Sequence, residues 1–411
     1  MVPMEENGSA RPDETIIIRA GWLIDGKGDA PLRDRIIEIK NGEIRSVRPG
    51  YSGIFCGEGA SVCLLDWQDA TVMPAWIDCH VHLGMSGTCD ADERKAQLQA
   101  DEETLRPVIE RHLGAYRQWG VVAVRHGGDR FGLALRYCRE KRLSKAGLPI
   151  QVACAAAAWH RQGRYGSLIG HAPAPGLSLA QAIERALSVD PQDRPDHVKI
   201  VQSGLNSLTH FGHESAPQFS LEELRQAVAV TRNAGLPVMV HANGREPVDL
   251  AVKAGCGSIE HGFFIGRDVL LRMADAGTVW VPTAVTMKAY AEALPAGSLQ
   301  ADIARRTLDE QIRQLRLARQ FGVRVAMGTD AGSMGVHHGR SYLEEFRLFL
   351  AAGYTVGEAA GCAARQGAAL LGLDRLGTIE AGKQAVLVKI GGGPEMVPNH
   401  LEHLAVADFT R

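Results

Sequence analysis

Residues 72–82 read VMPAWIDCHVH, an apolar run that ends in two histidines separated by one residue. Alternate side chains of an extended strand project from the same face, so His80 and His82 can meet one cation. From this point the chain alternates short apolar runs with longer amphipathic segments, which is typical of β/α units around a parallel sheet. The stretch therefore predicts the first strand of an α/β fold and the first pair of metal ligands.

Short apolar strands recur along the rest of the chain. Ser220 with Glu223, and Thr355 with Glu358, form capping boxes that open helices between or after these strands, and Gly235 ends the first of them. Eight strand–helix repeats predict a (β/α)8 TIM barrel, in which the chemistry lies at the carboxyl ends of the strands. The expected strands are 72–82, 121–126, 150–157, 197–202, 237–241, 258–261, 278–283 and 324–330.

Both ends of the chain carry a different pattern. Residues 15–20 and 36–47 are β-rich, and the turn Asn41-Gly42 breaks the second run. Residues 386–390 form an apolar run that can return to the same sheet. We expect a flexible tail over 1–14, a small β-sandwich domain built from 15–69 and 375–411, and the barrel over 70–374.

Composition excludes several classes of protein. The 411 residues are 45% hydrophobic and 22% charged, with a formal net charge of -2. These values argue against disorder and against a polybasic nucleic-acid module. No apolar run approaches the roughly 20 residues of a membrane span, and the polar start does not resemble a secretory signal. We expect a cytoplasmic protein that acts on a small molecule, without nucleic-acid or membrane partners; a homo-oligomer is compatible with the sequence.

The eight cysteines are scattered without a CxxC pair, and several lie inside apolar runs. This usage predicts buried, reduced thiols instead of a disulfide framework. They are Cys56, Cys63, Cys79, Cys89, Cys138, Cys154, Cys256 and Cys362.

Further metal-ligand residues end other predicted strands. His241 ends PVMVH, His261 ends SIEH and Asp330 lies in AMGTD, while Lys199 lies midway along HVKIVQ. One isolated histidine at a strand end is a weak signal. Because the carboxyl ends of barrel strands meet at one rim, the whole set predicts a metal site there.

This ordered set resembles the amidohydrolase superfamily over nearly the whole chain. The phrases QFSLEELRQAV, AGCGSIEHG, VWVPT, MGTDAG and LLGLDRLGTIEAGK are similar to its imidazolonepropionase-like branch, which includes Xaa-Pro and Xaa-Arg dipeptidases. The resemblance implies hydrolysis of a C–N amide bond in a dipeptide, an N-acyl amino acid or a cyclic amide. It also implies two divalent metal ions, with zinc as the expected metal.

The resemblance also implies a role for each ligand. His80, His82 and Asp330 would bind one ion, and His241 and His261 the other. Lys199, carboxylated on its side-chain nitrogen, would bridge both ions. Asp330 would act as general base and then general acid around a metal-activated water. Two alternatives stay open: a mononuclear deaminase or ring-opening hydrolase of the same superfamily, and a non-catalytic scaffold that keeps the fold.

Substrate-binding candidates come from the loops that follow the strands. They are His126, His160, Tyr165 and Asn243. His126 stands where relatives usually have aspartate, and Asn243 where dipeptidase relatives often have tyrosine. The tail after the 386–390 run also departs from its relatives, which usually continue to another strand near the end. The loop histidines His210, His213, His337 and His338 are candidates to shape a lid or to lie at the surface.

Overall fold

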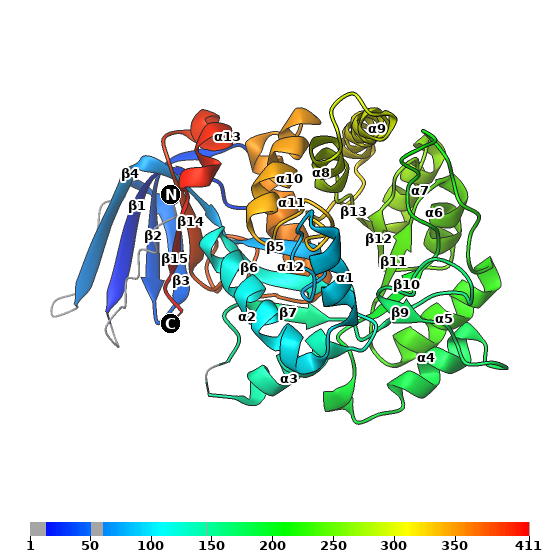
Figure 1. Ribbon diagram of the computed structural model, residues 1–411. Coiled ribbons are helices and arrows are strands. Elements are labelled where there is room, and N and C mark those ends of the chain that lie inside the picture. The colour runs from blue at the N-terminus through cyan, green and yellow to red at the C-terminus, as the bar shows by residue number, and fades with distance from the viewer. Residues whose placement is uncertain (1–13, 51–60, 146, 411) are drawn as a thin grey trace.

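The computed structural model describes residues 14–50, 61–145 and 147–410, and has a mixed α/β fold. A mainly antiparallel sheet lies at one side of a larger body of parallel strands and helices (Figure 1). The expected tail, except for Glu14, lies outside the described residues, as does Cys56. No helix within the described part of the chain has the length and apolar character needed to cross a membrane.

Both chain ends contribute to one six-stranded sheet, shown in blue and red in Figure 1. Its strands are β1 (Thr15–Leu23), β2 (Leu32–Lys40), β3 (Glu43–Pro49), β4 (Val62–Pro74), β14 (Val386–Gly391) and β15 (Ala405–Asp408). Their order is β15-β14-β4-β1-β2-β3, with β1 and β4 parallel and the other pairs antiparallel. Asn41 and Gly42 have φ of 53° and 71°, the left-handed backbone that a tight hairpin between β2 and β3 needs.

The described residues form one continuous sheet, in which the 13-residue β4 accepts β1 along one edge and β14 along the other. The sheet curls back on itself, since Glu43 at the start of β3 bridges Gln384 just before β14, so the expected β-sandwich stays a prediction. A strand also follows β14 in the tail, since β15 pairs with β14 from Val386↔Asp408 to Lys389↔Ala405. The buried face of the sheet has its own core, to which β1 contributes Ile16 and Ile18.

The larger body contains two parallel sheets. Their strands are β5 (Trp76–Val81), β6 (Val121–His126), β7 (Gln151–Cys154), β8 (Ala158–Trp159), β9 (Gly170–His171), β10 (Val198–Val201), β11 (Val238–Ala242), β12 (Ser258–His261) and β13 (Val279–Val281). One sheet has the order β5-β6-β7 and the other β13-β12-β11-β10-β8-β9. All these pairs are parallel, and helices alternate with the strands.

The expected eighth strand, 324–330, is extended without a continuous ladder. The N–H of Ala326 donates to the carbonyl of Trp280 in β13 (2.9 Å), and the N–H of Asp330 donates to the carbonyl of His80 in β5 (2.7 Å). This segment therefore lies between the first and last strands of the body.

Helices surround the parallel strands. They are α1 (Ala91–Gln99), α2 (Glu102–Gln118), α3 (Leu133–Leu143), α4 (Leu179–Leu187), α5 (Leu221–Asn233), α6 (Arg245–Lys253), α7 (Arg267–Ala276), α8 (Val285–Ala293), α9 (Leu299–Phe321), α10 (Arg340–Ala351), α11 (Val356–Ala363), α12 (Arg365–Leu371) and α13 (Val397–His400), with 3-10 turns η2 (Pro191–Asp193), η3 (Pro394–Met396) and η4 (Leu401–His403). The capping boxes Ser220–Glu223 and Thr355–Glu358 begin α5 and α11, as predicted.

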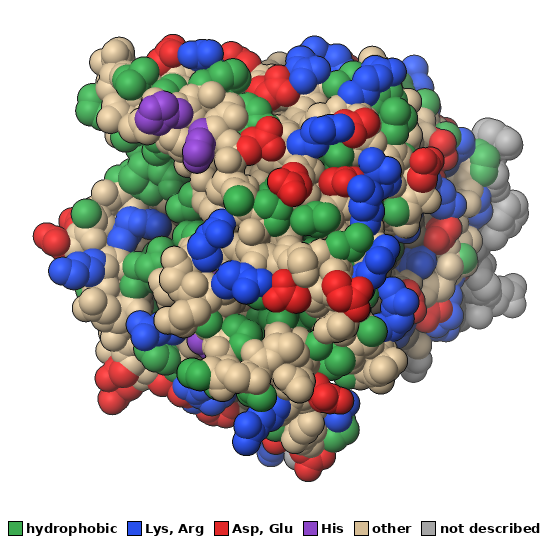
Figure 2. Space-filling model, turned by 90° about the vertical axis from the view of Figure 1, so that its right-hand side faces the viewer, with side chains coloured by type: hydrophobic (Ala, Val, Ile, Leu, Met, Phe, Trp, Pro, Cys, Tyr) green, Lys and Arg blue, Asp and Glu red, His purple; other side chains and the backbone are tan. Residues whose placement is uncertain are grey.

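The outer helices carry interleaved charges. Figure 2 shows the face on the side of α4 to α7, where basic and acidic side chains are mixed instead of forming a patch of one sign. Arg245 pairs with Asp268 across α6 and α7 at 2.7 Å, and Arg272 pairs with Asp249 at 2.6 Å. Such exposed pairs contribute little to stability, so this face is a solvated surface.

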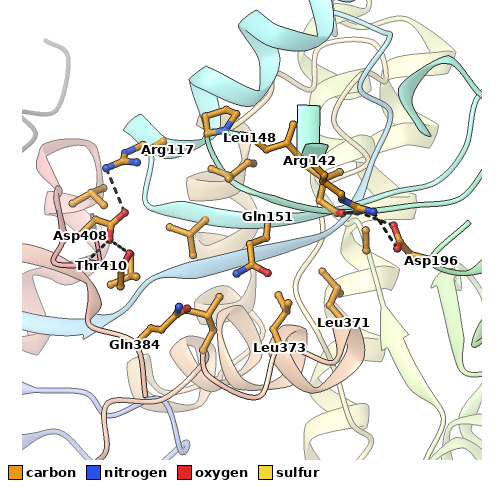
Figure 3. A pocket seen from close by; sticks show the side chains of 18 residues that line it. Arg117, Arg142, Leu148, Gln151, Asp196, Leu371, Leu373, Gln384, Asp408 and Thr410 are labelled. Atoms are coloured by element: carbon orange, nitrogen blue, oxygen red, sulfur yellow. Dashed lines mark hydrogen bonds and ion pairs between the residues drawn. The ribbon is translucent and has the colours of Figure 1, made fainter. Parts of the chain in front are cut away.

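A cavity of about 500 Å³ lies where the six-stranded sheet meets the larger body (Figure 3). Arg117 of α2 pairs with Asp408 of β15 at 3.4 Å on one side, and Arg142 of α3 pairs with Asp196 at 3.0 Å on the other. Apolar side chains such as Leu373 line the space between these pairs. None of the predicted metal ligands lines this cavity.

Candidate metal centre and active site

His80, His82 and Asp330 converge at the carboxyl ends of β5 and of the 324–330 segment. Their ligand atoms lie within 4.8 Å of one another. The carboxylate Oδ1 of Asp330 is 3.5 Å from His80 Nε2 and 3.4 Å from His82 Nε2. Two imidazoles and one carboxylate with a shared open point form a donor set suited to a divalent transition metal.

Lys199, His241 and His261 lie beside this cluster. Lys199 Nζ is 3.5 Å from His80 Nε2. The ring centroid of His261 is 4.9 Å from that of His80 and 4.7 Å from that of His241. All the predicted ligands line one cavity of about 250 Å³, although only His80, His82 and Asp330 meet at a common point.

Each imidazole is held through one ring nitrogen. His80 Nδ1 donates to Glu260 Oε2 (3.0 Å), and His82 Nδ1 donates to the carbonyl of Gly128 (3.0 Å). His261 Nδ1 bonds Thr283 Oγ1 (2.8 Å), and His241 Nε2 donates to the carbonyl of Gly204 (3.2 Å). The opposite nitrogen of each ring is left for a metal ion, which is the usual arrangement of ligating histidines.

The buried ion pair between Glu260 and Arg125 orients the His80 ring. Glu260 also accepts from Arg125 Nη2 (2.7 Å) and from the hydroxyl of Ser258 (2.5 Å), and all three side chains are buried. Asp78 accepts from the backbone N–H and the hydroxyl of Thr329, which ties β5 to the segment carrying Asp330. Sequence reasoning missed these residues that contact the predicted ligands, although Arg125 and Glu260 could have been found as charged residues inside apolar strands.

Burial sets the charge state of these groups in the protein itself. It lowers the pKa of His82 and of His241 to about 3 and holds those of His80 and His261 well below the usual range. The imidazoles are therefore neutral at pH 7, the form that binds metal. Burial also lowers the pKa of Lys199 to about 8, so its amine loses its proton more readily than that of an exposed lysine.

Uncommon backbone conformations gather at the site. His261, Thr283 and Asp330 have φ of 65°, 45° and 59°, a region that non-glycine residues seldom enter. Each residue stands at or just after the carboxyl end of a strand. Such strain persists only where the surrounding contacts hold it, and it is concentrated at functional sites in proteins.

Two of the substrate-binding candidates line the cavity. Tyr165 lies with its ring centroid 5.3 Å from that of His241. Asn243 also lines the cavity, but its amide is engaged: Oδ1 accepts from the N–H of Phe263 (3.2 Å) and Nδ2 donates to the carbonyl of Gly204 (3.3 Å). Asn243 therefore joins the loops that follow β10 and β12.

The other two candidates lie outside the cavity wall. His126 is buried next to His82, with ring centroids 5.9 Å apart, and bonds Asp129 Oδ2 through Nε2 (3.3 Å). His160 Nδ1 donates to the carbonyl of Arg161 (3.0 Å), and Gly166 packs directly on its side chain. His126 lines a smaller cavity beside this one together with His82, and His160 Nε2 is buried without a hydrogen-bond partner, so a substrate role for either stays a prediction.

The loop histidines differ in burial and in their contacts. His210 and His213 are exposed in the loop after β10. His338 is buried and stacks on His112 at 4.0 Å, with Tyr116 donating to its Nδ1 (2.9 Å) and its Nε2 donating to the carbonyl of Met85. His338 is therefore a packing residue beneath the rim and not part of a lid.

The geometry places a donor set that could hold a divalent metal at the carboxyl ends of parallel strands in an α/β fold. A family model for the amidohydrolase family matches residues 71–409, and the chain belongs to this family. The family is metal-dependent, and the chain is a hydrolase, as the sequence predicted.

Individual relatives are consistent with this assignment. A crystal structure of a Xaa-Pro dipeptidase with bound methionine in the active site has a TM-score of 0.77, 28% identity, and coverage of 95% of this chain and 97% of that one. An imidazolonepropionase from Rhizobium meliloti is 26% identical over 93% of this chain and 92% of its own length. The crystal structure of the Aspergillus niger ochratoxinase shares the fold, with a TM-score of 0.77 at 20% identity over 97% and 95% of the two chains.

Proposed function

We propose that the parallel strands and the 324–330 segment close into a (β/α)8 barrel over residues 70–374, with a small domain formed by 15–69 and 375–411. The bonds from Ala326 to β13 and from Asp330 to β5 support the closure, since they join the first and last strands of the body. A barrel would bring all predicted ligands to its catalytic rim.

We propose that the chain hydrolyses an amide C–N bond of a small substrate with two bound divalent metal ions, zinc being the expected metal. The observation that carries this proposal is the set of neutral imidazoles whose second nitrogen is tied to protein. His80, His82 and Asp330 would hold one ion, and His241 and His261 the other. Lys199, carboxylated on Nζ, would bridge them; its buried position next to His80 Nε2 supports this role.

When bound, the two cations would lower the pKa of a water molecule and polarise the substrate carbonyl. Asp330 would accept the proton of the attacking water and return it to the leaving amine. Ser333 donates its hydroxyl to Asp330 Oδ2 (2.8 Å), which leaves Oδ1 toward the histidines and fixes the carboxylate plane. In the protein without bound metal, burial raises the pKa of Asp330 to about 6.

Tyr165 is the substrate-binding candidate that the cavity supports best. Its phenol faces the cavity beside His241, and burial raises its pKa, so the hydroxyl stays protonated and can donate to a carbonyl oxygen. Asn243 would shape the cavity floor through its two loop contacts. For His126 and His160 we propose support of the neighbouring loops.

A second candidate is a mononuclear deaminase or ring-opening hydrolase with the same fold. The convergence of only His80, His82 and Asp330 on one point favours it. In that case Lys199 would remain an amine, and His241 or His261 would contact the substrate instead of a second ion.

Metal content per chain, measured on protein purified without chelator, separates these candidates. It should be read together with hydrolysis of a panel of dipeptides, N-acyl amino acids and cyclic amides. About two ions and turnover of an amide support the binuclear enzyme. About one ion with no amide turnover favours the mononuclear alternative, and no metal after add-back contradicts both.

We also propose a cytoplasmic location. The seven cysteines in the described part of the chain are unpaired, as expected for a reducing compartment. Cys89 is exposed, however, so the expectation that the thiols are buried does not hold for it. A free-thiol count on denatured protein made without reductant tests whether the thiols stay reduced.

A further inference from the structure

Arg94 brings a cationic side chain into the wall of the active-site cavity from outside the metal cluster. It lies on α1, the helix that follows β5, and it lines the cavity together with the predicted ligands. Among the described lining residues, the ionisable groups other than the metal cluster are Arg94 and the phenols of Tyr165 and Tyr290. Arg94 is therefore the cation available to a substrate once the ligands hold their ions.

The guanidinium is fixed by backbone carbonyls, and its charge acts on the Asp330 carboxylate only at longer range. Arg94 Nη1 donates to the carbonyl of Gly332 (3.0 Å) and to that of Thr88 (3.3 Å). These bonds connect α1 to the loop two residues beyond Asp330. No described carboxylate forms an ion pair with Arg94, although Asp92 and Glu93 stand next to it in the chain. Its Nε and Nη2 have no protein acceptor among the described residues.

The rest of the cavity wall is largely apolar. Met85, Leu98, Leu208 and Phe263 line it, and Leu168 and Leu205 line it while 50% and 57% exposed. Half-exposed leucines at a cavity mouth offer contact area to an apolar ligand group. The only carboxylate on the described wall is Asp330, which belongs to the metal cluster, so an ammonium group on the substrate would find no free acidic partner.

We propose that Arg94 binds a carboxylate of the substrate, so that the amide hydrolysed is an N-acylated acid with an apolar acyl group and no free amine. This inference rests on the proposed amide hydrolysis and narrows its substrate class. A guanidinium matches a carboxylate in shape and charge, and such a bond inside a partly closed cavity is stronger than a neutral one. A neutral cyclic amide would leave Arg94 unused, and a dipeptide would place its ammonium among apolar side chains.

Three ligands of one shape test the proposal: N-(3-phenylpropanoyl)-leucine, its analogue without the carboxylate, N-(3-methylbutyl)-3-phenylpropanamide, and the dipeptide Phe-Leu. We expect the metal-loaded protein to bind the first about 10- to 100-fold more tightly than the second, and more tightly than the dipeptide. Calorimetry measures these dissociation constants for the ligands that are not cleaved, and steady-state KM replaces them for a ligand that is. Hydrolysis should show the same preference in kcat/KM.

Variants separate the contribution of Arg94 to carboxylate binding from that of the metal ions, which also attract anions. Arg94→Met should remove most of the preference for the carboxylated ligand, raising its KM with little change in kcat, while leaving the neutral analogue unaffected. Arg130→Met is the matched control, since Arg130 follows β6 on a neighbouring loop and does not line this cavity. It should behave as the unaltered protein.

Two failures can be told apart. If no amide is cleaved with metal bound but the binding preference depends on Arg94, the hydrolysis proposal fails and the carboxylate site stands. If Arg94→Met keeps the full preference, or weakens all three ligands equally together with stability, Arg94 is a structural tie between loops and the inference is overturned. Equal or tighter binding of Phe-Leu would contradict the exclusion of a free amine.

Discussion

Asp330 has three structural features that bear on its proposed role. Its φ is 59°, its carboxylate accepts a hydrogen bond from Ser333, and it lies close to both His80 and His82. Asparagine tolerates the left-handed backbone better than most residues do. Asp330→Asn therefore keeps the local conformation while removing the group that accepts the proton. This makes it a cleaner test than an alanine substitution.

We predict that Asp330→Asn lowers kcat about 10²- to 10⁴-fold, the usual contribution of general acid–base catalysis. Steady-state kinetics on the amide that the panel identifies measures the loss, and circular dichroism checks the fold. The exposed Asp275 on α7 supplies the control, Asp275→Asn, which should retain activity. Normal turnover by Asp330→Asn would show that another group moves the proton.

Glu260 acts through His80, since it touches the imidazole and not the cavity. We predict that Glu260→Gln weakens metal binding about 10- to 100-fold, the usual effect of losing the partner that orients a ligating histidine. It also leaves the charge of Arg125 buried without its partner, which lowers stability. Metal competition measures affinity, and unfolding of the metal-free protein measures stability separately.

The exposed substitution Glu222→Gln on α5 should change neither quantity. If Glu260→Gln lowered stability but left metal affinity intact, Glu260 would support the fold alone and His80 would be held by other contacts.

At the scale of elements, local chemistry made some helices predictable. The Ser220–Glu223 box lies entirely within one turn, so its hydrogen bonds do not depend on distant residues, and α5 begins where the pattern indicates. The Asn41-Gly42 hairpin was predictable for the same reason. That the predicted ligands line one cavity was predictable, because the carboxyl ends of parallel strands lie on the same side of the fold.

Elements that depend on distant partners were not predictable. The expected strand 150–157 ends at Cys154, and the chain forms a separate two-residue strand, β8, that pairs with β10 instead of β6. The 324–330 segment makes its bonds to β13 and β5 in turn, without a ladder along either. β15 exists because β14 offers it a free edge. Arg94 was missed because nothing in its helical surroundings marks it; only the folded loops bring it to the cavity.

The capping box of α5 allows a quantitative test of local stability. We predict that Ser220→Ala lowers the free energy of unfolding by about 1 kcal/mol, since the Glu223 N–H loses its acceptor at the helix start. Denaturant unfolding measures the change. Ser188→Ala at the end of α4 is a comparison in which the hydroxyl only bonds a helix carbonyl, so a smaller loss is expected. An equal loss in both variants would contradict a specific capping role.

At the scale of the whole molecule, we expect the candidate site to lower the free energy of unfolding when no metal ion is bound. Three buried imidazoles (His80, His241 and His261), the half-buried His82 and Asp330, and the buried Lys199 face one cavity, where burial disfavours the charged form of each group. A cation that binds the folded chain and not the unfolded one satisfies these groups and shifts the folding equilibrium by mass action. Metal should therefore be a stability factor as well as the source of activity.

We predict that removing metal with a chelator lowers the thermal midpoint, and that zinc restores it. At free zinc about 1,000 times its dissociation constant, the gain in unfolding free energy is about 4 kcal/mol. His82→Ala should lose most of this zinc response because it removes a ligand of the converging cluster, whereas His210→Ala, in an exposed loop, should keep it. Differential scanning calorimetry with and without zinc measures the shift, and an identical midpoint in both conditions would mean that the cavity holds no metal in the folded protein.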